Sequence, residues 1–237
     1  MRNILRTIVK FFYNQLRYTK FAEAIEEEFE MQSYSGVTSR HFEYPYGISK
    51  VVKLDKKKKV KKILDAGAFG SPFGPILASL GFNITGVDIS KWEIKFPGFK
   101  YIVGDLKNLP FKSESFDVIT NISTIEHCGL PRFGEKEVRD GDVIAMKEIY
   151  RVCVKGGYCI LTTPYAGKGT VFYNKHRVYD KRTFRRLIGK FKIQETSFFA
   201  PVSVPHVFEP CSEKQIEKIN ATLKGDHGVI CTVLKKP

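Results

Sequence analysis

The chain lacks paired cysteines. Its cysteines are widely spaced and form no C-x-x-C pair; the five are Cys128, Cys153, Cys159, Cys211 and Cys231. Disulfides persist in oxidising compartments, whereas scattered thiols are typical of proteins kept reduced in the cytosol. We therefore expect reduced thiols and a cytoplasmic location, with Cys153 and Cys159 serving as core residues.

The chain also lacks a long uninterrupted apolar run. Residues 1–31 are predicted to form a helix in which basic residues early and glutamates later interrupt the apolar positions. That charge excludes a signal peptide and a membrane span. Two interpretations stay open: residues 1–20 lie on a membrane surface as a peripheral contact, or this helix covers the sheet domain or its substrate cleft.

Acidic residues are scarce beside basic ones. The chain has 25 Asp and Glu residues and 39 Lys and Arg residues, which gives a formal net charge of +14. Such a charge attracts anions, whether RNA, anionic lipid or a phosphorylated substrate. It is equally typical of a lysine-rich solvated surface.

The length of 237 residues suits one domain with an N-terminal extension, and 43% hydrophobic residues suffice for a sizeable core. No internal repeat is present, and the lysine run before residue 60 is the sole low-complexity tract. We predict a helical extension and a substrate-side loop over residues 1–59, followed by an α/β domain over residues 60–237. The loop, residues 33–47, is both aromatic and polar and is predicted to close over a substrate.

The stretch Val60–Ser90 predicts a strand–helix–strand unit. One apolar strand ends in Asp65, a glycine-bearing turn and a helical segment follow, and a second strand ends in Asp88. Ligands of open α/β sheets bind at the carboxyl ends of the strands, and an acid about twenty residues past the turn is placed to bind a ribose. These two acids therefore indicate a nucleoside-containing cofactor.

The turn departs from the dinucleotide fingerprint G-x-G-x-x-G. Phe69 stands at the second glycine position, where a pyrophosphate would need bare backbone. We therefore predict a cofactor without phosphates. A carboxylate at Asp65 suits the ammonium of S-adenosylmethionine (SAM), and one at Asp88 suits the hydroxyls of its ribose.

At these residues the chain resembles the class I SAM-dependent methyltransferases, whose first motif is an acid-x-Gly-x-Gly-x-Gly turn and whose second strand ends in an acid. Asp65-Ala66-Gly67 and Val87-Asp88 match, whereas Phe69 and Ser71 replace glycines. The motifs that follow also occur in the order typical of the family. They are a third strand followed by Asp105, a fourth strand followed by an E-H loop, a helix ending in R-V, a K-x-G-G turn and a fifth strand.

The resemblance implies an α/β fold, a Rossmann-like seven-stranded methyltransferase sheet with helices on both faces. A helix capped by Asp180, a strand at 191–199, a helix at 212–223 and a strand at 229–234 would complete it. In the family the acid after the third strand binds the adenine amino group, and the next backbone N–H serves a ring nitrogen. The residues expected to bind SAM are Asp65, Gly67, Ala68, Ser71, Asp88, Ile89, Asp105, Leu106 and Asn121.

Methyl transfer to an alcohol needs an aligned nucleophile and a base for its proton. In this fold the loop after the fourth strand lies beside the methyl group, so Glu126 and His127 are candidates. The alternative is that both pin this loop and support cofactor binding. Residues 172–179 follow the fifth strand on the same sheet edge, and His176 is the best single candidate for a general base.

A narrower resemblance concerns the run S-x-I-E-H-x-G-L-x-R-F-G and the later N-x-H-R-x-Y-D. It is similar to a little-characterised methyltransferase branch associated with cell-surface polysaccharide synthesis. Magnesium-dependent RNA and ubiquinone-pathway O-methyltransferases instead carry E-x-x-E-H, and here Ser123 replaces the first acid, so we expect no metal.

Three function classes stay open. The first is an O-methyltransferase acting on a sugar or another hydroxylated small molecule. The second is an RNA methyltransferase whose positive charge holds phosphates. The third is a cofactor-binding interaction protein without turnover, which Phe69 in the glycine turn would permit. The sequence leaves the oligomeric state open.

Overall fold

The computed structural model describes residues 39–58, 60–131, 136–172, 176–203, 207–221 and 227–237. The chain divides into two compact units, Met1–Ser35 with Gly70–Pro72, and Gly36–Phe69 with Phe73–Pro237. All helices and strands of the described residues belong to the second unit. The predicted helix at 1–31, and with it the membrane contact of residues 1–20, lies outside the described residues.

The helices are α3 (Arg40–Lys58), α4 (Phe73–Ser79), α5 (Gly141–Val152), α6 (Lys181–Ile188) and α7 (Glu213–Ile216), with a 3₁₀ turn η1 (Ile125–His127). The strands are β1 (Ile63–Ala66), β2 (Ile84–Asp88), β3 (Phe99–Val103), β4 (Phe116–Ile122), β5 (Cys153–Tyr165), β6 (Thr170–Phe172), β7 (His176–Val178), β8 (Lys192–Ser203), β9 (Val207–Cys211) and β10 (Gly228–Lys235).

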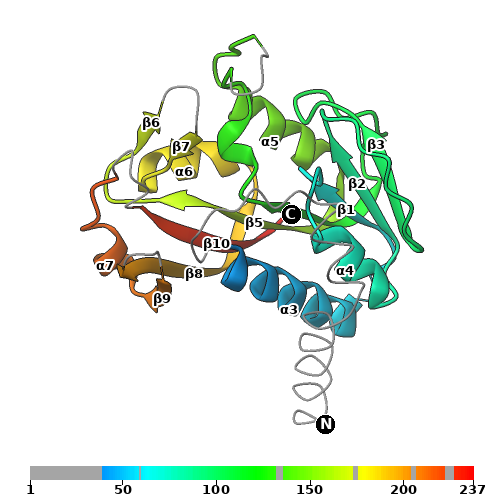
Figure 1. Cartoon of the computed structure of the whole chain (residues 1–237), viewed down its shortest axis with the longest axis horizontal. Coiled ribbons are helices and arrows are strands. Elements are labelled where there is room, and N and C mark those ends of the chain that lie inside the picture. The colour runs from blue at the N-terminus through cyan, green and yellow to red at the C-terminus, as the bar shows by residue number, and fades with distance from the viewer. Residues whose placement is uncertain (1–38, 59, 132–135, 173–175, 204–206, 222–226) are drawn as a thin grey trace. The chain divides into compact units, whose positions relative to one another are not determined.

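The central sheet has the strand order β3-β2-β1-β4-β5-β10-β8-β9, and β6 pairs with β7 in a separate hairpin (Figure 1). The first five strands of that order are parallel, and β10, β8 and β9 are antiparallel to their neighbours. The predicted fold class is confirmed. The described sheet has eight strands where seven were predicted, because β9 folds back on β8 as an added edge.

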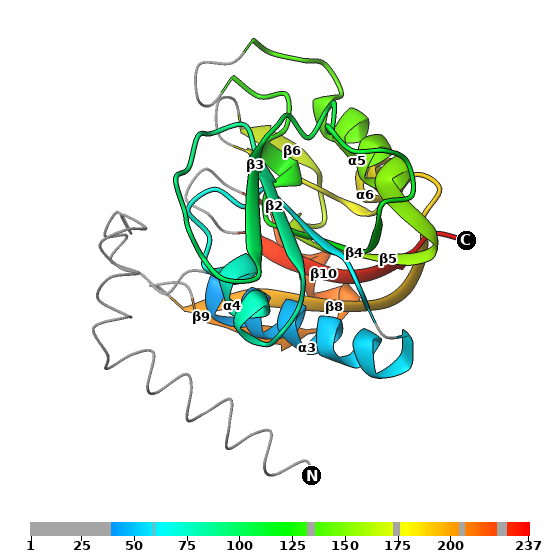
Figure 2. The same cartoon turned by 90° about the vertical axis from the view of Figure 1, so that its right-hand side faces the viewer.

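Helices cover both faces of this sheet (Figures 1 and 2). On one face, α5 and α6 pack through side chains such as Met146 and Leu187 against Leu64, Ile119 and Leu161. On the other, α3 and α4 bury Val51 and Leu77 in a second cluster. The middle strands β1 and β4 are buried almost throughout, as expected for parallel strands covered on both sides.

Two predicted segments differ from the structure. Residues 40–47, predicted as a substrate-side loop, form the first half of α3, which buries Tyr46 against the sheet and tolerates Pro45 within the helix. The predicted helix at 212–223 is α7, Glu213–Ile216, so it ends far earlier. Its predicted cap is confirmed, because the Ser212 hydroxyl accepts from the N–H of Gln215.

Other local predictions hold. Asp180 caps α6 in a reciprocal pair with Thr183. All five cysteines are free, and Cys153 and Cys159 are fully buried. Within the described residues, no helix has the length and apolar content that crossing a bilayer requires.

Candidate active site

The parallel strands bring their carboxyl ends to one edge of the sheet. Asp65 of β1 is in register with Gly86 of β2 and with Thr120 of β4, and Asp88 is in register with Val103 at the end of β3. Three predicted acids therefore gather here, since Asp105 follows β3 by two residues. This edge is where open α/β sheets bind their ligands.

Asp65 is almost fully buried at this edge. Its Oδ1 accepts a hydrogen bond of 2.9 Å from the Thr120 hydroxyl, while Oδ2 is buried and has no hydrogen-bond partner among the described residues. Burial raises the pKa of this carboxyl to about 7 and the charge of Asp88 adds to the shift, while the hydrogen bond from Thr120 and the nearby N–H of Gly74 offset part of it. A buried carboxylate oxygen left unpaired is costly, so this atom fits a cationic ligand group such as an ammonium.

The turn after β1 is closely packed. Gly67 has φ of +95°, and a Cβ atom there would lie 2.3 Å from the side chain of Thr124. Its N–H and that of Ala68 donate to the carbonyl of Val87 at 2.8 and 3.2 Å. Gly67 and Ala68 therefore hold the turn against β2 through their N–H groups. Of these two residues, Gly67 is the one that must lack a side chain, because its backbone lies close to the side chain of Thr124.

Asp88 is oriented by two backbone groups. Oδ2 accepts from the N–H of Phe69 at 3.4 Å, and Oδ1 accepts from the N–H of Ser90 at 3.1 Å. Burial raises the pKa of Asp88, and these two bonds lower it by less. Each carboxylate oxygen has a further lone pair, so the group is placed to accept two ribose hydroxyls.

Apolar side chains surround Asp88. Phe69 is 49% exposed, Ile89 41% and Val103 54%, and they follow or end β1, β2 and β3. Leu106 is buried, while Asp105 is partly exposed and accepts from the N–H of Lys107 at 2.8 Å and from its ammonium at 3.0 Å. An apolar rim with an acid on each side suits a purine and its ribose.

The side chain of Asn121 serves the loop and not an open ligand position. It is fully buried, its amide donates to the carbonyl of Ala66 at 2.8 Å, and its oxygen accepts from the N–H of Ile125 at 3.1 Å. It thus ties the end of β1 to η1. Its predicted part in cofactor binding stays a prediction. Ser71 belongs to Gly70–Pro72, and its role stays a prediction.

A buried polar cluster at the end of β4 was missed from the sequence. Glu43 of α3 is fully buried and accepts hydrogen bonds from Ser39, from Arg40 at 2.7 Å and from the hydroxyl of Ser123. Arg40 also donates to the Ser123 carbonyl at 3.3 Å. Burial alone would raise the pKa of Glu43, but Arg40 and the hydrogen bonds hold it below its usual value.

In this cluster the carboxylate of Glu43 accepts a hydrogen bond from Ser123, the residue at the position of the first acid in the E-x-x-E-H motif. Ser123 has φ of 42°, a strained value for a residue other than glycine, and its bonds to Glu43 and Arg40 hold it there. The carboxylate of Glu43 is, however, already paired with the guanidinium of Arg40. Among the described residues, no group of three or more His, Cys, Asp or Glu side chains is placed to hold a metal ion.

Glu126 and His127 form η1 beside this cluster. Glu126 is buried, its Oε2 accepts from the Thr163 hydroxyl at 3.2 Å, and burial raises its pKa to about 8. Its Oε1 lies 3.8 Å from Nε2 of His127. Glu126 therefore lies beside His127, and the catalytic roles of both residues stay predictions.

The predicted histidines lie together. The ring centroids of His127 and His176 are 6.2 Å apart. The ring of His227, a residue that no motif predicted to belong to the site, lies 5.1 Å from that of His176. Arg177 has a structural role, since its guanidinium donates to the carbonyls of Glu126 and Cys128 at 3.1 and 2.8 Å. Three segments far apart in sequence thus bring imidazoles to one place.

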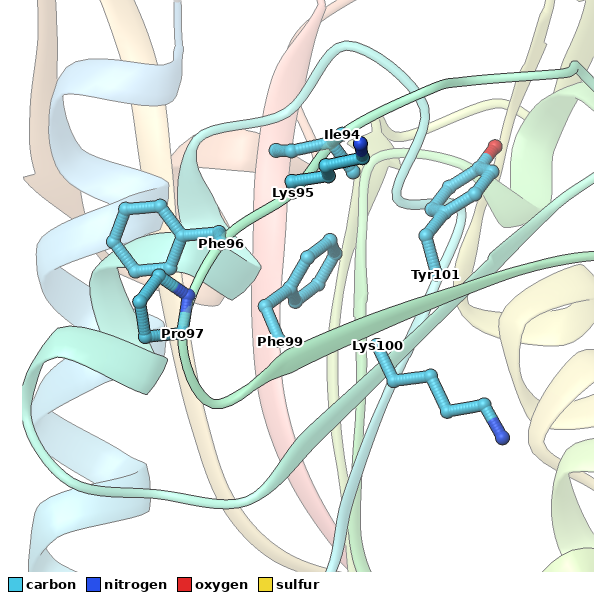
Figure 3. Close-up of a pocket in the computed structure, with 7 residues that line it drawn as sticks. All are labelled: Ile94, Lys95, Phe96, Pro97, Phe99, Lys100 and Tyr101. Carbon is cyan, nitrogen blue, oxygen red and sulfur yellow. The ribbon is translucent and has the colours of Figure 1, made fainter.

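A hollow of about 620 Å³ lies elsewhere, along the β2–β3 connection and the start of β3; its lining residues are Ile94, Lys95, Phe96, Pro97, Phe99, Lys100 and Tyr101 (Figure 3). In Figure 3 Lys100 extends away from the ring of Phe99. Asp105 follows the other end of β3, whereas Tyr101, which lines this hollow, donates to the carbonyl of Ser90 at 2.7 Å, so this part of the hollow adjoins the segment that follows Asp88.

Comparison with known proteins agrees with this geometry. The family model described as "Methyltransferase domain" matches residues 64–161. The phthiotriol/phenolphthiotriol dimycocerosates methyltransferase of Mycobacterium tuberculosis is 36% identical over 87 residues, which are 37% of this chain and 27% of that protein. The demethylmenaquinone methyltransferase of Chlorobaculum tepidum is 25% identical over 136 residues, 55% of this chain and 52% of that protein.

A solved structure shares the fold. The N-methyltransferase NodS from Bradyrhizobium japonicum, in complex with S-adenosyl-L-homocysteine (SAH), superimposes with a TM-score of 0.54 at 11% identity, covering 91% of this chain and 97% of its own. Residues 64–161 are thus similar to a methyltransferase domain, which supports the predicted enzyme class and its SAM cofactor. The chain spans about a quarter of the length of the mycobacterial relative, and the link to polysaccharide synthesis stays a prediction.

We expect Asp88→Ala to weaken SAH binding at least 100-fold, because both ribose hydroxyls would lose a charged acceptor at about 1.5–3 kcal/mol each. Titration calorimetry measures this directly. Asp117→Ala is the matched control, since Asp117 also accepts two backbone N–H bonds but lies at the start of β4, on the opposite edge. Equal affinity of wild type and Asp88→Ala would contradict the assignment.

We expect SAH binding to tighten as the pH rises from about 5.5 to 7.5. Without ligand the Asp65 carboxyl holds its proton up to its pKa of about 7, and a bound ammonium favours the ionised form, so binding releases this proton. The dissociation constant should fall by up to about tenfold per pH unit below that pKa. Calorimetry in two buffers counts the released proton.

Asp65→Asn keeps the shape of this side chain but removes its titration. In that variant the pH dependence should shrink to the part that Asp88 contributes. A wild-type affinity that is constant over this range, or that rises on acidification, would show that Asp65 does not meet the ammonium.

Proposed function

We propose that the chain transfers the methyl group of SAM to a hydroxyl oxygen of a small-molecule acceptor, with a histidine as general base. The observation that carries this proposal is the convergence of His127, His176 and His227 beside the ends of β4 and β5. An imidazole exchanges protons near neutral pH, which is what removal of an alcohol proton requires.

In this proposal the residues at the carboxyl ends of the strands have distinct roles. Asp65 binds the ammonium of the cofactor, and Asp88 binds its ribose between the exposed side chains of Phe69 and Ile89. When bound, SAM supplies an activated methyl group on its sulfonium. The chain orients the acceptor oxygen, receives its proton on an imidazole ring nitrogen, and keeps water away with buried side chains.

His176 is the favoured base. Its ring centroid lies 6.2 Å from that of His127, 5.1 Å from that of His227 and 5.4 Å from that of Phe172, so it has two imidazole rings and one apolar ring as neighbours. His127 is held close to the carboxylate of Glu126, which suits a residue that orients the acceptor or shares its proton.

Apolar surroundings favour a lipid-like or ring-bearing acceptor over a free sugar. Phe42 of α3 stacks on Phe199 at 4.2 Å and lies 5.3 Å from Phe208. Phe199 pairs with Val229, which follows His227 by two residues along the chain. Relatives named for phthiotriol and demethylmenaquinone support the same class. A lipid-linked sugar remains within the proposal.

The acceptor is identified by transfer of labelled methyl from SAM into fractionated extract, separated into lipid, polysaccharide, RNA and protein. Label in the lipid fraction supports the proposal, and label in RNA would replace it with the basic-surface alternative. Binding of SAM without transfer to any fraction would instead support a cofactor-binding interaction protein.

We expect His176→Ala to lower kcat on that acceptor by about 10²–10⁴-fold while SAH affinity is unchanged, because a general base acts on the acceptor proton and not on the cofactor. Single-turnover transfer and calorimetry separate the two effects. His41→Ala, at an exposed position of α3, is the control and should retain full turnover. Full turnover in His176→Ala with loss in His127→Ala would move the base to η1.

A further inference from the structure

The side chain of Phe69 departs from the glycine turn beside the proposed ribose-binding acid. Its backbone N–H donates to Oδ2 of Asp88 at 3.4 Å, so its Cα lies directly beside the group that binds the ribose. A phenylalanine places a ring at that point.

The ring of Phe69 is half exposed even though it is large and apolar. Ile89 and Val103, on the two neighbouring strand ends, are exposed to a similar degree. Exposed apolar side chains that gather beside a buried acid are typical of a ligand site, because the ligand covers them.

One side of the ring is already supported. Trp92 lies 6.3 Å from Phe69, nearly perpendicular to it, and Trp92 is itself held 5.2 Å from Tyr101. The Tyr101 hydroxyl donates to the carbonyl of Ser90 at 2.7 Å, which fixes this group against the segment that follows Asp88. The aromatic support is therefore tied to the same loop as the ribose acid.

We propose that Phe69 is a nucleoside-binding residue whose exposed ring packs on the adenosine part of SAM and SAH, with Trp92 as its support. This inference rests on the proposed function for the presence of the cofactor. It goes further because it attributes part of the affinity for SAM and SAH to Phe69, the residue that replaces a glycine of the motif.

The test compares Phe69→Leu, which removes the ring but keeps an apolar side chain, with Phe69→Tyr, which keeps the ring. Loss of an aromatic contact should weaken SAH binding about 3- to 10-fold in Phe69→Leu, and Phe69→Tyr should stay within about twofold of wild type. Trp92 is the single tryptophan of the chain, so its fluorescence reports binding, and calorimetry gives the dissociation constants.

Phe82→Leu is the matched control, because Phe82 precedes β2 at the opposite edge of the sheet. Adenosine is the second probe. Phe69→Leu should weaken adenosine and SAH by the same factor, which places the contact on the nucleoside. Wild-type SAH affinity in Phe69→Leu, or weakening of SAH without weakening of adenosine, would overturn the inference. Failure of the wild type to bind SAM or SAH would instead overturn the proposed function.

Discussion

The parallel pairing of β1 with β2 and β4 is the constraint on which the site depends. Because Asp65 is in register with Gly86 and Thr120, the ends of these strands and their following loops must meet at one edge. The side chain of Asn121 then joins the two loops by bonding to Ala66 and Ile125. The acids proposed to bind the cofactor and the loop proposed to carry the catalytic residues are thus fixed by the same set of strands, which would pre-organise them for transfer.

A second constraint comes from outside the matched domain. Glu43 of α3 is fully buried, and its charge is compensated by Arg40 and by hydroxyl donors, including that of Ser123. Removing one partner from such a cluster would leave an uncompensated buried charge. Helix α3 therefore secures the strained residue at the end of β4, and through it the short turn that carries Glu126 and His127.

The strand ends were predictable because a short apolar run followed by an acid is a local pattern, as at Asp65 and Asp88. The cap of α6 was predictable for the same reason. Helix α3 was not, because Pro45 and Gly47 resemble loop residues and the helix is stabilised by packing of Tyr46 on the sheet. Glu43 and His227 were missed because their partners lie about 80 and 50 residues away, where only the tertiary fold brings them together.

The central claim is that a nucleoside cofactor lies across the carboxyl ends of β1, β2 and β3. Hydrogen exchange measured with and without SAH tests it most directly, because the claim names the amides that the ligand must cover. Exchange should slow at Phe69, at Ile89 and Ser90, and at Leu106 and Lys107, with no change at Asp117 on the opposite edge. Protection confined to the hollow at 94–101, or no protection at the three strand ends, would contradict it.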